Sequence, residues 1–335
     1  MKKILQLLFE YKTLTQQQAK EVLVNMGKGM YNEHEITAFM TVYLMRTITI
    51  EELSGFRDAL LELSVKPDLG GYDTIDIVGT GGDGKNTFNI STLSCFIVAG
   101  AGQKVSKHGN YGATSVSGSS NVMEHLGYRF KNDSSQLKAE LEEANICFLH
   151  APLFHPALKI VSSIRKNIGI RTFFNMLGPL VNPSNPSYQL IGVYNLELAR
   201  IYTYLLQQQQ TKFTIIHNLD GYDEISLTTE TKMVTNEGES ILTPQQLGKR
   251  TVDAADIYGG SSVEEAAKIF SQILKGKGTW AQNSVVFANA ATALHQSGAY
   301  KSYDDAFNAA IESLESGKAY QSFQQLMKLQ HEYTG

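Results

Sequence analysis

A glycine-rich turn between an apolar strand and an apolar helix is the feature that most constrains this chain. Residues 78–92 read Val-Gly-Thr-Gly-Gly-Asp-Gly-Lys-Asn-Thr-Phe-Asn-Ile-Ser-Thr. The run before them, 75–78, predicts a buried strand, and the run after them, 93–99, predicts a helix that packs inward. Glycines let backbone N–H groups approach a ligand closely, and a helix start adds unpaired N–H donors. The stretch therefore predicts a phosphate or diphosphate site between Gly79 and Thr92.

The dinucleotide-binding loop is the first known loop type to compare. Gly79-x-Gly81-x-x-Gly84 satisfies its fingerprint as a pattern. That fingerprint also expects an acidic residue about 20 residues further on, to bind the ribose hydroxyls. Residues 102–108 hold no acid, although Ser106 and Lys107 would suit a ribose that carries a 2′-phosphate. A phosphorylated dinucleotide therefore stays open on this point alone.

The P-loop is the second loop type to compare, and its pattern fails. Asn86 follows Gly84-Lys85 where a P-loop has Ser or Thr. The turn also carries an acid of its own, Asp83, which a neutral diphosphate cradle does not need. A carboxylate there favours a site for a sugar with hydroxyls, or for Mg²⁺. The structural alternative is a glycine turn that binds nothing.

The composition indicates an ordinary globular chain. Its 335 residues are 42% hydrophobic and 19% charged, enough for two domains with a large core. The net charge of −4 predicts no general attraction to nucleic acid or to anionic membranes. No apolar run has the roughly 18 residues of a membrane span, and the N-terminus is not typical of a signal peptide. Two cysteines in apolar runs predict buried free thiols in a reducing, cytoplasmic compartment.

The first 68 residues show helical spacing and no strand pattern. Thr15 followed by Gln18, and Asn32 followed by Glu35, are typical of helix-starting capping boxes. Helices are expected at about 33–46 and 50–65, with apolar stripes that need a partner surface. We therefore expect a small helical domain.

From residue 72 the pattern becomes alternating. Short β-rich runs separated by helical ones predict an α/β domain with a mostly parallel central sheet flanked by helices. Three helices at 263–275, 280–297 and 303–316 are expected to end the chain. The expected strands are 74–78, 103–106, 145–149, 170–173, 190–193, 213–217 and 232–235.

Lys107 follows the second predicted strand. Parallel sheets bind ligands at the carboxyl ends of their strands, which places Lys107 beside the glycine turn, where an ammonium would balance phosphate charge. The loop after it, 109–120, is rich in glycine and serine and so in hydrogen-bond donors. The alternative is a surface turn with an incidental lysine.

Acidic and basic candidates lie further along the chain. Asp223 and Glu224 follow the strand at 213–216, and adjacent carboxylates there suit Mg²⁺, which also takes phosphate oxygens. Arg165 adjoins the apolar stripe of a helix at 156–167, where its guanidinium could bind a carboxylate with two parallel bonds. The alternatives are a solvated acidic turn and an exposed arginine at a helix end.

Several motifs in a fixed order closely resemble the anthranilate phosphoribosyltransferase family. The glycine turn alone would not separate that family from the pyrimidine nucleoside phosphorylases, but the joint occurrence is specific and spans nearly the whole chain. The motifs are Gly79-Thr80-Gly81-Gly82-Asp83, Asn89-Ile90-Ser91-Thr92, Lys107-His108-Gly109-Asn110, Gly169-Ile170-Arg171-Thr172, Leu177-Gly178-Pro179-Leu180, Gly221-x-Asp223-Glu224, Gly259-Gly260-Ser261 and Asn289-Ala290-Ala291.

The resemblance implies a reaction and an organisation. The substrates would be anthranilate and 5-phosphoribosyl 1-diphosphate, with two Mg²⁺ ions, in tryptophan biosynthesis. Residues 1–70 would form a helical domain joined by helices from about 150–185, and residues 71–335 the α/β catalytic domain. A homodimer is implied, and neither nucleic acid nor a membrane is an expected partner.

The resemblance also implies residue roles. Catalysis would rest on Lys107, Asn110 and Arg165, and anthranilate would contact Gly79, Asn110 and Arg165. Ser91 and Glu224 would hold one Mg²⁺, and Asp223 with Glu224 the second. Tyr111 stands where this family often has Arg or Lys. The phosphoribosyl diphosphate contacts would be Gly79, Gly82, Asp83, Thr87, Asn89, Ile90, Ser91, Thr92, Lys107, Ser115 and Ser119.

Two other functions compete with this one. Nucleoside phosphorolysis would use the same fold but leaves Arg165 and the surroundings of Asn110 unexplained. A nucleic-acid-binding relative without catalysis would need a basic groove and a damaged acid pair. The net charge of −4 and the intact Asp223-Glu224 argue against it.

Overall fold

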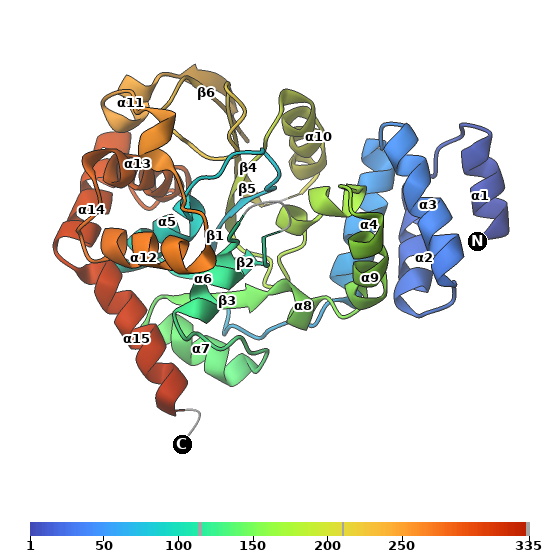
Figure 1. Ribbon diagram of the computed structural model, residues 1–335, viewed down its shortest axis with the longest axis horizontal. Helices are drawn as coiled ribbons and strands as arrows, with labels where there is room; N and C mark the ends of the chain where they lie inside the picture. Colours follow the sequence, from blue (N-terminus) through green and yellow to red (C-terminus); the bar gives the residue numbers. More distant parts are fainter. Residues whose placement is uncertain (113–115, 210, 333–335) are drawn as a thin grey trace. The chain divides into compact units, whose positions relative to one another are not determined.

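The computed structural model describes residues 1–112, 116–209 and 211–332, and the chain divides into two compact units. Unit 1 contains residues 1–66 and 151–185, and unit 2 contains residues 67–150 and the chain from 186 onward. Figure 1 shows unit 1 as helices only, and unit 2 as a sheet with helices around it. No helix in the described ranges is both long and apolar enough to cross a membrane.

Unit 1 is built from helices with well-defined starts. Both predicted capping boxes are confirmed, at Thr15 and at Asn32, and a third begins at Thr49. The helices expected at 33–46 and 50–65 are present with slightly shorter bounds. The elements are α1 (Lys2–Phe9), α2 (Gln16–Gly27), α3 (Glu33–Met45), α4 (Ile50–Leu63), α8 (Ala151–Phe154), α9 (Leu158–Ile168) and the 3-10 helices η1 (Phe173–Met176) and η2 (Gly178–Leu180).

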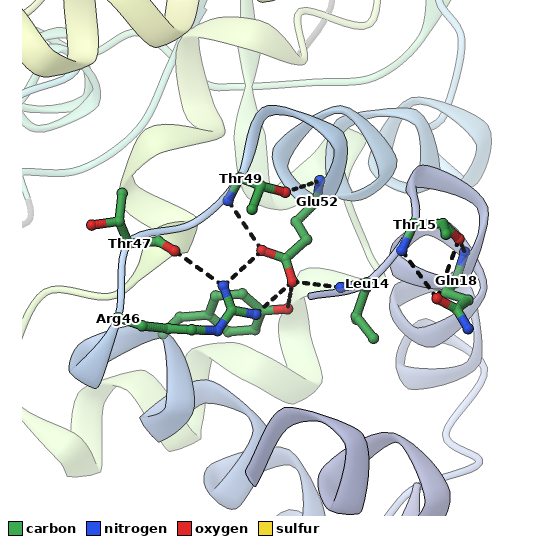
Figure 2. A network of polar contacts seen from close by, with 8 residues as sticks. Leu14, Thr15, Gln18, Arg46, Thr47, Thr49 and Glu52 are labelled. Atoms are coloured by element: carbon green, nitrogen blue, oxygen red, sulfur yellow. Dashed lines mark hydrogen bonds and ion pairs between the residues drawn. The ribbon is translucent and has the colours of Figure 1, made fainter. Parts of the chain in front are cut away.

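A fully buried carboxylate joins three segments of unit 1 (Figure 2). Glu52 accepts hydrogen bonds from the Leu14 and Thr49 amides, from the Tyr43 hydroxyl and from two nitrogens of Arg46. Burial, the largest single effect, raises the pKa of Glu52, but these bonds together lower it below its usual value. The network shows why a charged residue can sit in this core, since every lone pair that loses water gains a donor.

Unit 2 confirms the predicted α/β class with a mostly parallel sheet. The strand order is β3-β2-β1-β4-β5-β6-β7, parallel from β3 to β5 and antiparallel beyond. The strands are β1 (Ile75–Gly79), β2 (Val105–Gly109), β3 (Ile146–His150), β4 (Tyr188–Gly192), β5 (Lys212–Asn218), β6 (Thr231–Thr235) and β7 (Gly238–Leu242). The helices are α5 (Ile90–Gly100), α6 (Ser119–His125), α7 (Ser134–Glu143), α10 (Leu196–Gln207), α11 (Pro244–Gly248), η3 (Ala254–Ile257), α12 (Val263–Leu274), α13 (Trp280–Gln296), α14 (Tyr303–Glu315) and α15 (Lys318–Glu332).

Three expectations about these elements were wrong. Residues 170–173 form no strand, because the Asn175 side chain accepts the Thr172 N–H at 3.1 Å and turns the chain into η1. Strand β7 was missed because its residues are mostly exposed and lack an apolar face. Helix α15 was missed after the expected last helix.

The order in which the chain adds strands to the sheet reverses between the parallel strands β1 and β4. The chain leaves β1 through α5 toward β2, and leaves β4 through α10 toward β5, on the other side. Figure 1 shows α5 and α10 on opposite sides of these strands, as right-handed crossovers require. The carboxyl ends of β1 and β4 therefore flank the switch point, where sheets of this kind bind ligands.

Candidate active site

The glycine turn after β1 uses the conformational freedom that its sequence predicts. Gly81, Gly82 and Gly84 have φ angles of +65°, +80° and +73°, a region that side chains with a Cβ rarely adopt. The far end of the turn is tied down by residues 257–260: the Asn86 side chain donates to the Gly260 carbonyl at 2.7 Å, and the Gly259 amide donates to the Asn86 carbonyl at 2.8 Å. The turn is thus held at both ends.

Asp223 packs against the carboxyl ends of both switch-point strands. A Cβ at Gly79 would collide with the Asp223 carboxylate, and a Cβ at Gly192 would collide with its backbone carbonyl. The Gly81 amide donates to Asp223 Oδ2 at 2.7 Å. Glycine is therefore required at the ends of β1 and β4 so that an acid from the β5–β6 connection can reach the glycine turn.

Glu224 lies at the start of α5. Its Oε1 accepts the Ser91 amide at 3.0 Å, and its Oε2 accepts the Thr87 hydroxyl at 3.3 Å. The sequence assigned this helix start to phosphate, and the structure places a carboxylate on one of its amides. A negative group is stabilised there by the unpaired N–H groups and the helix dipole. The asparagine at the cap position, Asn89, makes no capping hydrogen bond to the first turn.

Three carboxyls influence one another at this point. Burial raises the pKa of Asp223 to about 7, helped by the nearby charge of Asp83. Burial also raises the pKa of Asp83, and burial together with the charge of Asp223 raises the pKa of Glu224 well above its usual range. Among the described residues no three His, Cys, Asp or Glu side chains are grouped as a metal site. Asp223 and Glu224 offer a pair, which suits Mg²⁺ when a substrate supplies further oxygens.

The raised pKa of Asp223 predicts opposite pH responses for folding and for metal binding. A carboxyl whose pKa is higher in the folded state stabilises the fold most below its unfolded pKa. We expect the free energy of unfolding in EDTA to fall as the pH rises from about 4 to about 7. Mg²⁺ affinity should rise between about pH 6 and 8, by up to about tenfold per pH unit for each proton released. Urea titrations and Mg²⁺ titrations at matched pH values measure both, and identical slopes in Asp223→Asn would contradict the assignment.

Buried oxygens without partners surround the start of α5. Thr80 Oγ1, Asn89 Oδ1, Thr92 Oγ1 and Ser117 Oγ have no hydrogen-bond partner among the described residues. Ser117 adjoins Asn89, whose Nδ2 donates to the Ser117 carbonyl at 3.1 Å. An unpaired buried polar atom costs about 1–3 kcal/mol, and native proteins retain such atoms mainly where a ligand or water completes them. Three hydroxyls and one amide oxygen fit the phosphate and sugar oxygens of a phosphorylated sugar.

Lys107 is buried beneath strand β1. The β1–β2 ladder has one register pair, Ile75 with Val105. Beyond this pair, side chains of one strand bond the backbone of the other. Lys107 Nζ donates to the Ile77 carbonyl at 2.7 Å. The positive charge of Lys107 lowers the pKa of Glu224, so it is felt at the acid pair. The expectation that Lys107 follows the second strand is wrong, because β2 continues to Gly109 and Lys107 lies within it. Its long side chain nevertheless brings the ammonium to the Ile77 carbonyl, two residues before Gly79.

Asn110 and the start of α6 are joined by hydrogen bonds. Asn110 Oδ1 accepts the Tyr111 amide at 2.8 Å, which fixes the orientation of the side-chain amide. The Asn110 carbonyl accepts the Ser119 hydroxyl at 3.4 Å and the Ser120 amide at 3.2 Å. Ser115, which the sequence assigned to the phosphates, lies outside the described residues.

Tyr111, the departure from the family pattern, makes contacts that a basic residue would not. Its ring packs edge-on against His150 with centroids 4.9 Å apart, and its hydroxyl donates to Glu124 Oε1 at 3.3 Å. Phe130 stacks on the same imidazole at 4.4 Å. Tyr111 therefore adds an aromatic contact beside Asn110 in place of a positive charge.

Arg165 lies in unit 1, whereas the other candidate residues lie in unit 2. Its guanidinium donates to Asn175 Oδ1 at 3.2 Å and lies 5.7 Å from the centre of the Phe174 ring. Burial lowers the pKa of Arg165 from its usual value. The alternative of an exposed arginine at a helix end is thus wrong, because the Arg165 side chain is half-buried and held by the Asn175 amide. Arg165 is paired with no carboxylate among the described residues.

Sequence reasoning missed several residues of this site. Thr80 was noted within the glycine-turn motif and given no role, and Ser117 was covered only as part of the donor-rich loop 109–120. Gly192 ends a strand, and only its contact with Asp223 shows why it is glycine. Asn289 was noted within a motif and given no role, although a polar residue amid the alanines and valines of α13 is a usable signal.

The fold agrees with comparisons to known proteins. A family described as "Glycosyl transferase family, a/b domain" matches residues 71–320, and its "helical bundle domain" matches residues 2–64. The anthranilate phosphoribosyltransferase of Christiangramia forsetii is 56% identical over 98% of this chain and 99% of its own length. That of Bacteroides thetaiotaomicron is 54% identical with the same coverage.

Solved structures give the same result. The crystal structure of anthranilate phosphoribosyltransferase from Thermus thermophilus superposes with a TM-score of 0.89 at 29% identity, covering 97% of this chain and 99% of that one. The enzyme from Saccharomyces cerevisiae in complex with PRPP and Mg gives 0.87 at 28% identity, covering 94% and 93%. A helical bundle domain followed by this α/β domain defines a two-domain glycosyl transferase. Within that class, the chain belongs to the anthranilate phosphoribosyltransferase family.

Proposed function

We infer that this chain is an enzyme of tryptophan biosynthesis. It transfers the phosphoribosyl group of 5-phosphoribosyl 1-diphosphate to the amino group of anthranilate, giving N-(5-phosphoribosyl)anthranilate and diphosphate. The observation that carries this in the structure is the acid pair Asp223-Glu224, which joins the glycine turn to the start of α5 at the switch point. Relatives that match over nearly the full length have the same activity in their names.

We propose that the phosphorylated sugar lies along the glycine turn and the start of α5. Buried hydroxyls without partners, glycines in left-handed conformation and the helix start support this placement. Ser115 belongs to the same proposal on sequence grounds alone. The contacts would be made by Gly79, Gly82, Asp83, Thr87, Asn89, Ile90, Ser91, Thr92, Lys107 and Ser119.

We propose two Mg²⁺ ions, one held by Ser91 with Glu224 and one by Asp223 with Glu224. Glu224 Oε1 already meets the Ser91 amide, so the two residues are adjacent. The pKa values of both acids are raised in the folded chain. A bound cation would favour the ionised carboxylates and so lower these pKa values. When bound, Mg²⁺ would neutralise charge on the departing diphosphate.

Charge and positioning account for the reaction at this site. As the bond from C1 of the ribose to diphosphate breaks, negative charge grows on the leaving group, and the buried Lys107 ammonium and backbone N–H groups stabilise it. The aromatic amine is neutral and needs little activation, so holding it beside C1 supplies much of the rate. No general base is required of the protein.

We propose that anthranilate is recognised by Gly79, Asn110 and Arg165. The Asn110 side-chain oxygen is bound to the Tyr111 amide, so the side chain would bind the ligand through its N–H donors. The Arg165 guanidinium, held by Asn175, offers a planar partner for the carboxylate. Both groups donate, as a carboxylate ligand requires.

Arg165→Ala is expected to raise KM for anthranilate by about 10–100-fold, since a hydrogen bond to a charged group contributes about 1.5–3 kcal/mol. KM for phosphoribosyl diphosphate should change by less than about threefold, because Arg165 lies outside the glycine turn. Steady-state kinetics with each substrate varied in turn measure both values. Lys166→Ala, an exposed neighbour on α9, is the matched control. Equal increases in both KM values would contradict the role of Arg165.

The direct test of the reaction is the loss of anthranilate fluorescence on adding phosphoribosyl diphosphate and Mg²⁺, with EDTA as the control. Metal-dependent loss is expected. Folded protein that shows no loss, but consumes a pyrimidine nucleoside when phosphate is added, would establish phosphorolysis instead. Binding of single-stranded DNA that weakens with salt would point to the non-catalytic alternative.

We also propose that unit 1 is the helical domain and that the chain forms a homodimer through it, with unit 2 as the catalytic domain. Apolar side chains at the surface of unit 1 support this: Phe9 is 62% exposed and Met45 is 85% exposed. An interface formed by this unit would cover such exposed apolar side chains. Sedimentation velocity at micromolar concentration would decide it, and a monomer would overturn it.

A further inference from the structure

The side chain of Asn289 replaces a missing strand partner for Ile225. Asn289 lies on α13 and is 2% exposed. Its Oδ1 accepts the Ile225 amide at 3.1 Å, and its Nδ2 donates to the Ile225 carbonyl at 2.9 Å. The same Nδ2 also donates to the Val285 carbonyl at 2.9 Å, within its own helix. One amide therefore satisfies both backbone polar groups of a fully buried residue.

Ile225 directly follows Glu224, in a segment that has no regular secondary structure. Residues 219–230 join β5 to β6 as turns and bends, so no sheet ladder holds the acid pair. Backbone groups buried in such a segment need partners from elsewhere, because leaving them unpaired is costly. Asn289 supplies those partners from a helix 64 positions further along the chain, directly beside the acids.

We propose that Asn289 is a positioning residue that sets the place of the Glu224 carboxylate. The amide pins Ile225, Ile225 fixes the backbone of Glu224, and Glu224 then meets the Ser91 amide and the Thr87 hydroxyl. The hydrogen bonds of the Asn289 side chain go to the backbone of Ile225 and Val285, so it acts through the segment that it holds. This inference rests on the metal role proposed above for Asp223 and Glu224.

The test replaces Asn289 by leucine, which keeps the branching at Cγ and removes every hydrogen bond of the side chain. Thr292→Val is the matched control, because Thr292 is buried on the same helix and donates to the Ala288 carbonyl at 2.8 Å, away from the acid pair. Mn²⁺ replaces Mg²⁺ as the probe, and electron paramagnetic resonance counts free Mn²⁺ in the presence of diphosphate. Hydrogen–deuterium exchange of residues 223–227 reports the backbone directly.

Asn289→Leu is expected to weaken Mn²⁺ binding by about 10–100-fold, the usual effect of removing a residue that orients a metal ligand. Exchange at 223–227 should become faster, while Thr292→Val leaves both measurements unchanged. Equal effects of the two variants would show a general loss of stability and overturn the proposal. If Asn289→Leu does not fold, Asn289→Ala is measured in the same way against Thr292→Val.

Glu224→Gln, measured in parallel, separates this inference from the metal assignment. Weak Mn²⁺ binding in Glu224→Gln with normal binding in folded Asn289→Leu would overturn the role of Asn289 alone. Normal Mn²⁺ binding in Glu224→Gln would overturn the metal assignment itself, and with it the positioning role. Weak binding in both, with Thr292→Val normal, is the expected result.

Discussion

Replacing Glu224 by glutamine is expected to lower kcat/KM by about 10²–10³-fold, a range typical of losing one electrostatic group in an active site. Glutamine keeps one oxygen for the Ser91 amide, and its NH2 group can donate to the Thr87 hydroxyl oxygen in place of accepting from it, so the local geometry survives. The negative charge that would hold Mg²⁺ is lost. Fluorescence assays over a range of Mg²⁺ concentrations measure the change, and excess Mg²⁺ should restore little of the activity.

The same variant should be at least as stable as the wild type. The pKa of Glu224 is raised by burial and by Asp223, so at neutral pH its ionised form destabilises the fold, and a neutral amide removes that effect. Urea unfolding at pH 8 in EDTA measures the difference. Glu230→Gln, an exposed acid of the same connection, is the control and should retain activity. An active Glu224→Gln, or one that fails to fold, would contradict the role assigned to this carboxylate.

Gly192→Ala is expected to cost about 1–3 kcal/mol of stability and most of the activity. The new methyl group would collide with the backbone carbonyl of Asp223, and backbone can move only by shifting the whole acid pair. Overpacking of this kind typically costs about 1–3 kcal/mol. Urea unfolding gives the free energy, and the dependence of the rate on Mg²⁺ shows whether the acids have moved.

Gly178→Ala is the matched control, because a Cβ at Gly178 meets nothing within 4 Å. It should leave stability within about 0.5 kcal/mol, as for substitutions away from special features. Normal dependence of the Gly192→Ala rate on Mg²⁺ would show that Asp223 can be displaced without effect, and would contradict its role as a metal ligand. A loss of stability without a change in Mg²⁺ dependence would lead to the same conclusion.

Local chemistry made part of this protein predictable. The capping boxes at Thr15 and Asn32 involve residues three positions apart, so their sequence alone specifies them. The glycine turn was predictable for the same reason, since left-handed backbone at Gly81, Gly82 and Gly84 needs glycine whatever the rest of the chain does. The alternation of strands and helices predicted the sheet, because parallel strands require crossovers.

Local patterns failed at two short segments whose apolar pattern does not reveal the structure that they form. Residues 170–173 are apolar enough for a strand, yet a side chain at Asn175 turns them. β7 has no apolar face, and pairing with β6 alone makes it a strand. In both cases a hydrogen bond formed after folding outweighs the weak preference of a short segment.

The sequence by itself determined the glycine turn, the fold class and the place of the adjacent acids in the chain, because each depends on residues close together in the chain. Only the tertiary structure decided that Glu224 occupies the start of α5, that Asp223 rests on Gly79 and Gly192, and that Asn289 holds the segment between them and β6. These contacts join residues from 31 positions apart (Gly192 and Asp223) to 144 positions apart (Gly79 and Asp223). Packing and buried hydrogen bonds select such pairs, and no local pattern of the chain records them.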